Sequence, residues 1–592
     1  MKQFLLTMAG VFAGLVIFLI GVPVVLVGMA LAAAAPQPVP SHTVLQLDLR
    51  GPLSDQSPNN PFWGLGRNST SVMAIIETLR RAESDDRIKG LLVRLPEGGM
   101  EPGMADEIRQ GFARFRAAGK PIYAHSQGVY PSGVVTTTYM LGAAADQFWM
   151  QPGASLQVTG VATEDLFLRR FFDKYGIVPQ YEQRQEYKNA VNSFLFSDYT
   201  APHREATVSW LSSVYASNLA AAAADRKAQP DALRAALESG PHGAEEALGL
   251  KLIDRVGQVR EAEEALLKTA GGDARTVDFD DYVDARPEPD RGLSDAIALI
   301  EAEGPIVTGE DRGSTPFTGG SAIYSDDLAK AIIRAGKSDK IKAIVLRVNS
   351  PGGSDTASEQ ILDAVRFAKA RGKPVVVSMG TYGASGGYWI ASEASAIVAQ
   401  PTTLTGSIGV YGGKFAFGPA LARFGVDVRQ TGVGGEYAGA FGLGQPFTAA
   451  QRDAFGGWMD HIYANFLTRV ATGRNLSPEQ VAEIAKGRVW TGAQAKSVGL
   501  IDEVGGFYQA VARAKTLAKI EGEIPLRRMS PSTGAFETLR KSLGVSGSSA
   551  RTLMAAAWIF GDPRAQAVID EVAETKLRSD GQGMVLAPMP FR

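Results

Sequence analysis

Two glycine-rich segments in the second half of the chain carry the residue types that acyl-transfer chemistry needs. One reads Asn-Ser-Pro-Gly-Gly, ending at Gly352 and Gly353, and the other covers 380–388; each directly follows an apolar stretch typical of a strand. Ser385, with small residues on both sides, suits a hydroxyl presented on a sharp turn where a helix begins. The amides of the first glycine pair and of Gly386 would then stabilise an oxyanion. The pattern predicts a serine nucleophile beside an oxyanion site.

The chain contains the same sequence pattern twice. Arg87-Ile-Lys-Gly-Leu-Leu-Val-Arg94 returns as Lys340-Ile-Lys-Ala-Ile-Val-Leu-Arg347, 253 positions later, and Gln151-Pro152 returns as Gln400-Pro401. A spacing this long indicates the duplication of a whole domain rather than a solenoid repeat. Differences between the aligned copies therefore indicate where the function lies.

The two copies have kept different pieces of chemistry. Ser385-Gly-Gly-Tyr388 aligns with Thr136-Thr-Thr-Tyr139, where three β-branched residues do not favour a sharp turn. Conversely, Lys188 of the first copy aligns with Ala438 of the second. A serine hydroxyl needs a base, and a lysine becomes one when burial lowers its pKa toward neutrality. We predict that the first copy supplies the general base, Lys188, and the second copy the nucleophile, Ser385.

Strands and helices alternate in both copies, as expected for parallel sheets with crossover helices. In the first copy we expect strands over 43–49, 90–95 and 121–124 and helices over 69–83 and 104–118. In the second copy we expect strands over 298–300, 343–348 and 374–379 and helices over 325–335 and 358–370. The predicted fold class is α/β.

Composition excludes several classes of protein. Sixty basic and sixty-two acidic residues leave a net charge of −2 with no basic stripe, which disfavours nucleic acid as a partner. The absence of cysteine excludes thiol catalysis, disulfides and thiolate metal sites. We predict a chain of 592 residues that uses neither a metal nor a cofactor.

The N-terminus contains an apolar run, 4–35, without a single charge. It is long enough to span a bilayer, which takes about 20 residues, so we predict a retained transmembrane anchor. The small residues 32–35 also suit a signal-peptide cleavage site, which stays an alternative. Lys2 favours a cytoplasmic N-terminus and places the bulk of the chain on the other side of the membrane.

Together these features resemble the signal peptide peptidase A (protease IV) family in its long, tandem-repeat form, over essentially the whole chain. The segments that carry the resemblance are the N-terminal anchor, Glu186-Tyr-Lys-Asn-Ala190, Asn349-Ser-Pro-Gly-Gly353, Ala384-Ser-Gly-Gly-Tyr388 and Leu404-Thr-Gly-Ser-Ile-Gly409. The resemblance implies a crotonase-like fold shared with Clp protease, a Ser385/Lys188 dyad, and Ser407 as a residue that orients the lysine. It also implies a homo-oligomer, expected to be a tetramer, that digests signal peptides on the periplasmic side of the bacterial inner membrane.

These inferences predict two tandem crotonase/ClpP-like domains after a transmembrane helix. The expected parts are a cytoplasmic tail 1–3, the anchor 4–35, a linker 36–43, an N-terminal repeat domain 44–290, a C-terminal repeat domain 291–545 and a C-terminal tail 546–592. Arg94 and Arg347, like Asp254 and Asp502, occur in both copies, so we expect them to serve the fold.

Two other functions stay open at this point. A coenzyme A thioester enzyme of the crotonase type also uses paired oxyanion amides, but usually with a carboxylate base and no nucleophile. A membrane-anchored scaffold with a vestigial site is the second alternative, because the first copy has already lost its serine.

Overall fold

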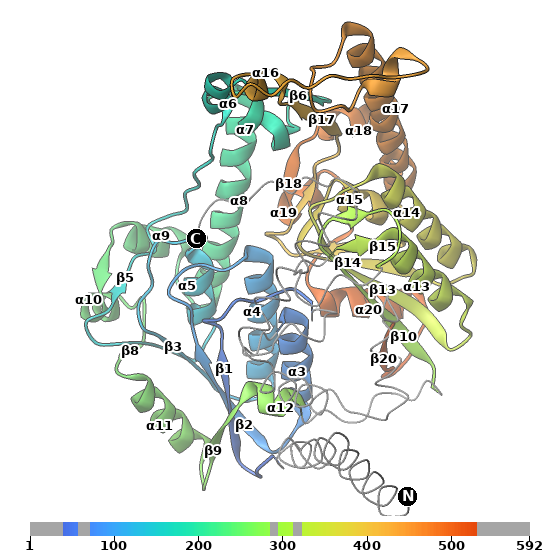
Figure 1. Ribbon diagram of the computed structural model, residues 1–592. Helices are drawn as coiled ribbons and strands as arrows, with labels where there is room; N and C mark the ends of the chain where they lie inside the picture. The colour runs from blue at the N-terminus through green and yellow to red at the C-terminus, as the bar shows by residue number, and fades with distance from the viewer. Residues whose placement is uncertain (1–38, 57–70, 285–293, 312–321, 530–592) are drawn as a thin grey trace, which may run out of the picture. The chain divides into compact units, whose positions relative to one another are not determined.

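The computed structural model describes residues 39–56, 71–284, 294–311 and 322–529, which contain two α/β halves (Figure 1). The predicted anchor 4–35 and both predicted tails lie outside these ranges. Within them, none of the helices combines the length and the apolar character that crossing a bilayer requires.

The first half is built on a six-stranded sheet of parallel neighbours in the order β8-β4-β3-β2-β1-β9. Its strands are β1 (Thr43–Asp48), β2 (Ile88–Arg94), β3 (Ile122–Ser126), β4 (Gln147–Met150), β8 (Arg255–Val256) and β9 (Arg275–Asp278). Its helices are α3 (Val72–Ser84), α4 (Pro102–Ala117), α5 (Thr136–Ala143), α6 (Arg169–Tyr175), α7 (Asn192–Leu195), α8 (Ala201–Asp225), α9 (Pro230–Glu238), α10 (Ala244–Gly249), α11 (Val259–Ala270) and α12 (Phe279–Asp284). The strands and helices predicted for the first copy are confirmed, with ends shifted by at most three residues.

The second half is built on an eight-stranded sheet in which β14, β13 and β10 are central. Its strands are β10 (Ala296–Glu303), β13 (Ile341–Ser350), β14 (Val375–Ala384), β15 (Ala396–Ala399), β16 (Leu404–Gly406), β18 (Val489–Thr491), β19 (Glu503–Val504) and β20 (Leu526–Arg528). Its helices are α13 (Ser325–Lys337), α14 (Asp355–Ala370), α15 (Gly386–Ala391), α16 (Gly418–Ala422), α17 (Ala449–Arg474), α18 (Pro478–Ile484), α19 (Gly492–Ser497) and α20 (Phe507–Leu517). The predicted elements are again confirmed, but β14 runs five residues further than expected and ends at Ala384.

Central strands of the second sheet are apolar on both faces because both faces are covered. Along β13, Ala343 and Val345 enter a core shared with the first half, whereas Ile344 and Leu346 enter a core beneath α13 and α14. Helices on both faces are the usual arrangement of parallel sheets, and they explain the continuous apolar runs in the sequence. The shared core joins the two copies.

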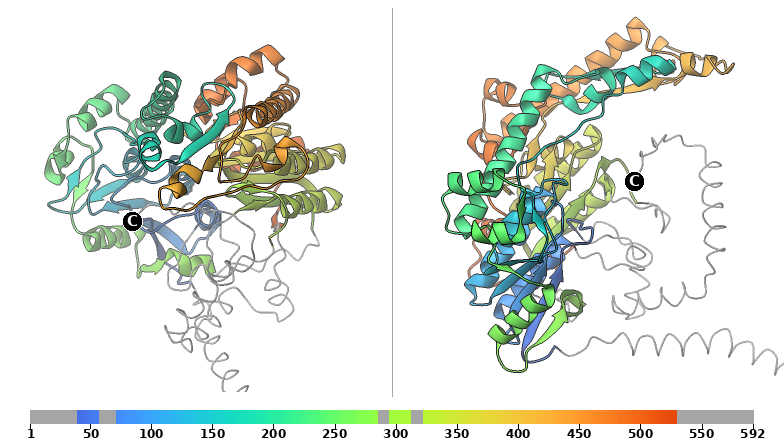
Figure 2. Two further views of the ribbon diagram at one scale, coloured as in Figure 1. Left: turned by 45° about the horizontal axis from the view of Figure 1, so that its top comes forward. Right: turned by 90° about the vertical axis from the view of Figure 1, so that its left-hand side faces the viewer.

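One strand from each half also forms a pair that joins the two halves. β6 (Val178–Gln183) of the first half pairs in antiparallel fashion with β17 (Tyr411–Ala416) of the second. Figures 1 and 2 show these two strands side by side, away from both large sheets. The remaining small pairs are β5 (Ser155–Leu156) with β7 (His242–Gly243) and β11 (Ile306–Val307) with β12 (Ile323–Tyr324). The β6–β17 pair brings the segment after residue 183 beside the segment before residue 411.

Candidate active site

Ser385 lies at a sharp turn between the last residue of β14 and the first residue of α15. Its φ of 53° and ψ of −119° are angles that residues other than glycine rarely adopt. The following residues must be glycine because a Cβ on Gly386 would lie 2.7 Å from Ser358 Oγ, and one on Gly387 would lie 2.7 Å from Ser350 O. The Ser-Gly-Gly sequence thus follows from packing, and the turn leaves the serine partly exposed.

Two glycine amides lie beside this turn. The Cβ position of Gly386 is 3.0 Å from the nitrogen of Gly353, and neither amide donates a hydrogen bond to an acceptor among the described residues. The amide of Gly352 is already engaged, since it donates to Ser350 Oγ at 3.2 Å. Its contribution is a backbone with a φ of 111°, which suits glycine. Gly353 and Gly386 are the amides available to an oxyanion.

The β6–β17 pair delivers Lys188 to the serine. Beyond the pair, the amide of Arg184 donates to Val410 O at 2.9 Å, which keeps the two segments together. Lys188 Nζ lies 3.1 Å from Ser385 Oγ, 2.9 Å from Ser407 Oγ and 2.8 Å from Ser407 O. The structure therefore brings together the amine of one copy and the hydroxyl of the other, as the sequence predicted.

Burial tunes the lysine for base chemistry. The side chain of Lys188 is 3% exposed, and desolvation lowers its pKa from 10.5 to about 7. Within the described part of the chain the amine is hydrogen-bonded to the two serines and to no carboxylate, so desolvation is the cause of the shift. A neutral amine is thus well populated at neutral pH, and it can accept the proton of a hydroxyl within hydrogen-bond distance.

Backbone geometry around the lysine depends on one glycine that sequence reasoning missed, Gly487, and on Gly409 and Ser407 of the segment 404–409. A Cβ on Gly487 would lie 2.6 Å from the nitrogen and Cβ of Lys188, and one on Gly409 would lie 3.2 Å from its Cδ. Ser407 has a φ of 49° and is held by its amide, which donates to Arg488 O at 2.7 Å. Gly487 stands in no motif, so nothing in the sequence marks it.

At the corresponding place, the described part of the first half has neither the sharp turn seen at Ser385 nor a free main-chain amide donor for an oxyanion. The chain enters α5 with ordinary helical backbone angles. The hydroxyls of Thr137 and Thr138 donate to main-chain carbonyls. The amide of Gly99, the counterpart of Gly353, donates to Ser132 O at 2.7 Å. The groups that would do chemistry in the second half are used structurally in the first.

The aspartates shared by the two copies serve the fold, as expected. Asp254 accepts hydrogen bonds from Arg226 and the amide of Phe148. Asp502 accepts the equivalent bonds from Arg474 and the amide of Ile397. Among the residues that the structure describes, no cluster of three or more histidine and acidic side chains is placed to hold a metal ion.

Comparisons with known proteins give matches to peptidases over most of the chain. The model of Peptidase family S49 matches residues 114–272 and again 367–521, and the Clp protease model matches residues 321–402. The chain is 34% identical to Protease 4 of Salmonella typhi, covering 81% of this chain and 78% of that protein. It is 30% identical to Protease 4 of Haemophilus influenzae, with coverages of 86% and 84%, and 31% identical to the chloroplastic serine protease SPPA of Arabidopsis thaliana, with coverages of 82% and 70%. A solved structure of a mutant of the 1510-N membrane-bound stomatin-specific protease is similar at 16% identity and a TM-score of 0.25, covering 40% of this chain and all of that one.

Proposed function

Because the chain belongs to peptidase family S49, is a serine peptidase and has a Clp-protease-like α/β fold with Peptidase S49 domains in two copies, we propose that Ser385 is its nucleophile and Lys188 its general base. The observation that carries this proposal is the 3.1 Å contact between Lys188 Nζ and Ser385 Oγ. Ser407 orients the lysine, and Gly353 and Gly386 supply the oxyanion donors. Neither a coenzyme A thioester enzyme nor a scaffold has an observation in its favour.

In the proposed reaction, neutral Lys188 takes the hydroxyl proton of Ser385 as Oγ attacks the scissile carbonyl. The carbonyl oxygen becomes an oxyanion, which the amides of Gly353 and Gly386 stabilise. The new ammonium then gives its proton to the leaving amine, and an acyl-enzyme remains. Water, deprotonated by the same amine, hydrolyses this ester and restores Ser385.

We further propose that the substrates are signal peptides left after secretion. The resemblance of the motifs to signal peptide peptidase A supports this substrate class, and the charge-free run 4–35 supports an anchor that holds the enzyme where such peptides accumulate. The same apolar run, with the positive charge of Lys2 before it, supports a location of both halves on the periplasmic side of a bacterial inner membrane.

The function is tested with the purified full-length chain and a synthetic peptide containing an apolar signal-peptide core. We expect cleavage within the apolar core, inhibition by a fluorophosphonate, and recovery of that label on the peptide that contains Ser385. A preparation that leaves the peptide intact and takes up no label would contradict the proposal. Assaying an acyl-coenzyme A thioester in parallel tests the rival chemistry.

We also propose that copies of the chain associate head to tail. Within one chain, β6 pairs with β17, but the repeat counterparts of these strands, 428–433 and 162–167, pair with no strand among the described residues. Most of both segments is exposed, including Leu166 at 72% and Val433 at 98%. Because the same pairing is available between one copy's 428–433 and the next copy's 162–167, the contact is heterologous and can close into a ring.

Charging this edge should dissociate the oligomer. We expect Leu166→Asp and Val433→Asp each to lower the mass measured by light scattering toward that of one chain, because a buried, unpaired carboxylate opposes association. Val208→Asp, on the exposed part of α8, is the matched control and should leave the mass unchanged. If both edge variants keep the mass of the wild type, this mode of assembly is wrong.

A further inference from the structure

The strand pair that leads to Ser385 contains a bulge at Asn349. β13 and β14 pair regularly as far as Val348, and the register then shifts before Ser350, so that Asn349 faces three residues of β14, 380–382. A bulge bends the strand and changes its twist, and bulges are common beside active sites. This bulge lies between the regularly paired part of β13 and β14 and the two segments that carry Gly353 and Ser385.

The side chain of Asn349 holds the bulge together. Its Oδ1 accepts the amide of Tyr382 at 3.0 Å, and its Nδ2 donates to Glu303 Oε1 at 3.0 Å. The first bond satisfies a main-chain donor that the interrupted strand ladder leaves over. Tyr382 comes three residues before Ser385, and Asn349 comes four residues before Gly353. One side chain therefore ties the path of the nucleophile to that of the oxyanion glycines.

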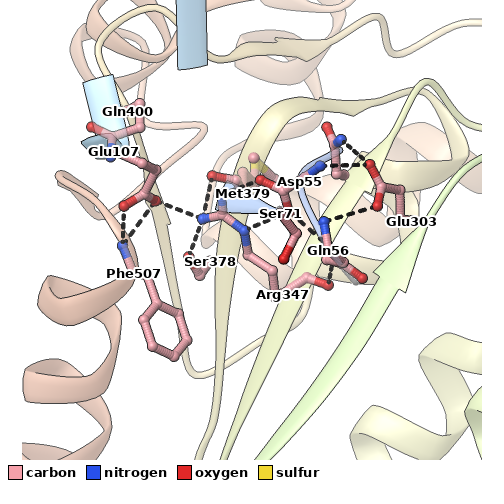
Figure 3. A network of polar contacts seen from close by, with 12 residues as sticks. Asp55, Gln56, Ser71, Glu107, Glu303, Arg347, Ser378, Met379, Gln400 and Phe507 are labelled. Atoms are coloured by element: carbon pink, nitrogen blue, oxygen red, sulfur yellow. Dashed lines mark hydrogen bonds and ion pairs between the residues drawn. The ribbon is translucent and has the colours of Figure 1, made fainter. Parts of the chain in front are cut away.

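Glu303 is itself held by a segment from the first half. Its two carboxylate oxygens accept the amides of Asp55 and Gln56, at 3.1 and 3.0 Å. The carboxylate of Asp55 accepts from Arg347, which also donates to Glu107 of α4 at 2.6 Å (Figure 3). The side chains of Arg347 and its two acidic partners are at most 2% exposed. Desolvation offsets much of the attraction in such a cluster, but loss of one partner is costly, so the arrangement resists displacement.

The half without a serine lacks this arrangement. Leu95 follows Arg94 as Val348 follows Arg347, but Gly99 lies five residues after Arg94 and Gly353 lies six after Arg347, so the first copy has no counterpart of Asn349. Its strands β2 and β3 pair without a register shift. Arg94, the counterpart of Arg347, is only partly buried and donates to Gln127. The two arginines thus differ in their contacts, because only Arg347 lies among carboxylates from the other half. The bulge and the hydrogen bonds that hold it therefore occur in the half that contains the proposed nucleophile, although both halves share the same fold.

We propose that Asn349 and Glu303 are positioning residues, which set the bulge and thereby place Ser385 relative to the amide of Gly353. The segment 54–56 completes this arrangement, so the first half contributes to the site both the lysine and the support of the nucleophile strand. This inference rests on the proposed function, since it concerns the same serine.

The test reverses the donor and the acceptor of the Asn349–Glu303 hydrogen bond in the full-length chain. Asn349→Asp keeps an acceptor for Tyr382 but sets a carboxyl group against the carboxylate of Glu303. We expect kcat per fluorophosphonate-titrated site to fall about 100-fold, because an error of about 1 Å in placement has that effect, while KM changes little. Combining it with Glu303→Gln restores a donor opposite an acceptor, but the new amide nitrogen also faces the N–H of Asp55, which Oε1 accepts in the wild type. We therefore expect only about tenfold of the loss to be recovered, as for one regained hydrogen bond to a charged group. Ser395→Ala is the matched control, because Ser395 Oγ accepts the amide of Val375 at the other end of β14; it should lower stability and leave kcat unchanged.

A purely structural role predicts a different outcome. It would lower the melting temperature and the number of titratable sites but leave kcat per titrated site near that of the wild type, and this result would overturn the proposal. A double variant no more active than Asn349→Asp would do the same. If Asn349→Asp does not fold, Glu303→Gln alone gives the same readout by the same criteria. Wild-type protein that takes up no fluorophosphonate would instead contradict the proposed function, so the two failures are distinguishable.

Discussion

Replacing Ser385 by alanine will reduce peptide hydrolysis by about 10⁴-fold or more, the usual result of removing the nucleophile of a serine peptidase. The fold should persist, because among the described residues the hydroxyl has one hydrogen-bond partner, Lys188, which keeps its two bonds to Ser407. Activity on a signal-like peptide and the circular dichroism spectrum measure the two effects separately.

Thr136→Ala is the matched control for this variant. Thr136 occupies the aligned position in the first half, where its Oγ1 accepts a hydrogen bond from Asn218. Loss of the Thr136 hydroxyl should leave kcat unchanged, because at this place the first half has neither the sharp turn seen at Ser385 nor free amide donors for an oxyanion. An alanine variant at 385 that keeps a tenth of the wild-type activity would exclude this serine as the nucleophile.

The duplication made both halves of the dyad predictable from one sequence. Ser385 stands out because its aligned residue is Thr136, and Lys188 stands out because its aligned residue is Ala438. The apolar runs of β13 and β14 predicted buried parallel strands because both of their faces are covered by helices. Each of these signals is local, or is a comparison between aligned copies, and so is visible in the sequence.

What could not be predicted depends on contacts between distant segments. The β6–β17 pair joins residues more than 220 positions apart, and neither strand has a sequence feature that identifies its partner. The need for glycine at position 487 arises only because Lys188 packs against it. β14 reaches Ala384 because, beyond the bulge at Asn349, it pairs again with Ser350 and also with β16. Asn349 is held there by Glu303, which accepts amides from the distant segment 55–56. Such geometry appears only when the halves are assembled.

The activity of the wild type should rise with pH through about 7 and then level off. Burial lowers the pKa of Lys188 to about 7, and only the neutral amine can accept the proton of Ser385. Below this pH, kcat/KM falls with the neutral fraction of the lysine. Lys188→Arg should lose about 10³-fold of the activity at every pH, because a guanidinium stays protonated and cannot act as a base.

Lys414→Met is the matched control for the lysine. Lys414 is also buried near the contact between the halves, at 6% exposed, but it donates to the carbonyls of Gly442 and Gln445 and not to a serine. Its variant should keep the pH profile of the wild type whatever it does to stability. A profile that stays flat between pH 6 and pH 8 would contradict the assignment of Lys188.

Stability provides a second, independent measurement of the same titration. The pKa of Lys188 is 10.5 when the chain is unfolded and about 7 when it is folded, so between these values the unfolded chain binds more protons. The contribution of this group to the free energy of unfolding therefore rises with pH across that window. Below about pH 7 the amine is protonated in both states, and the full cost of burying its charge lowers the stability of the folded chain. Lys188→Met removes the titration, so the stability of the wild type relative to this variant, from urea unfolding, should increase steadily from pH 7 to pH 10. Other groups cancel in the difference. A difference that does not change with pH would mean that the amine keeps its ordinary pKa in the folded chain, and an amine that stays protonated cannot activate Ser385.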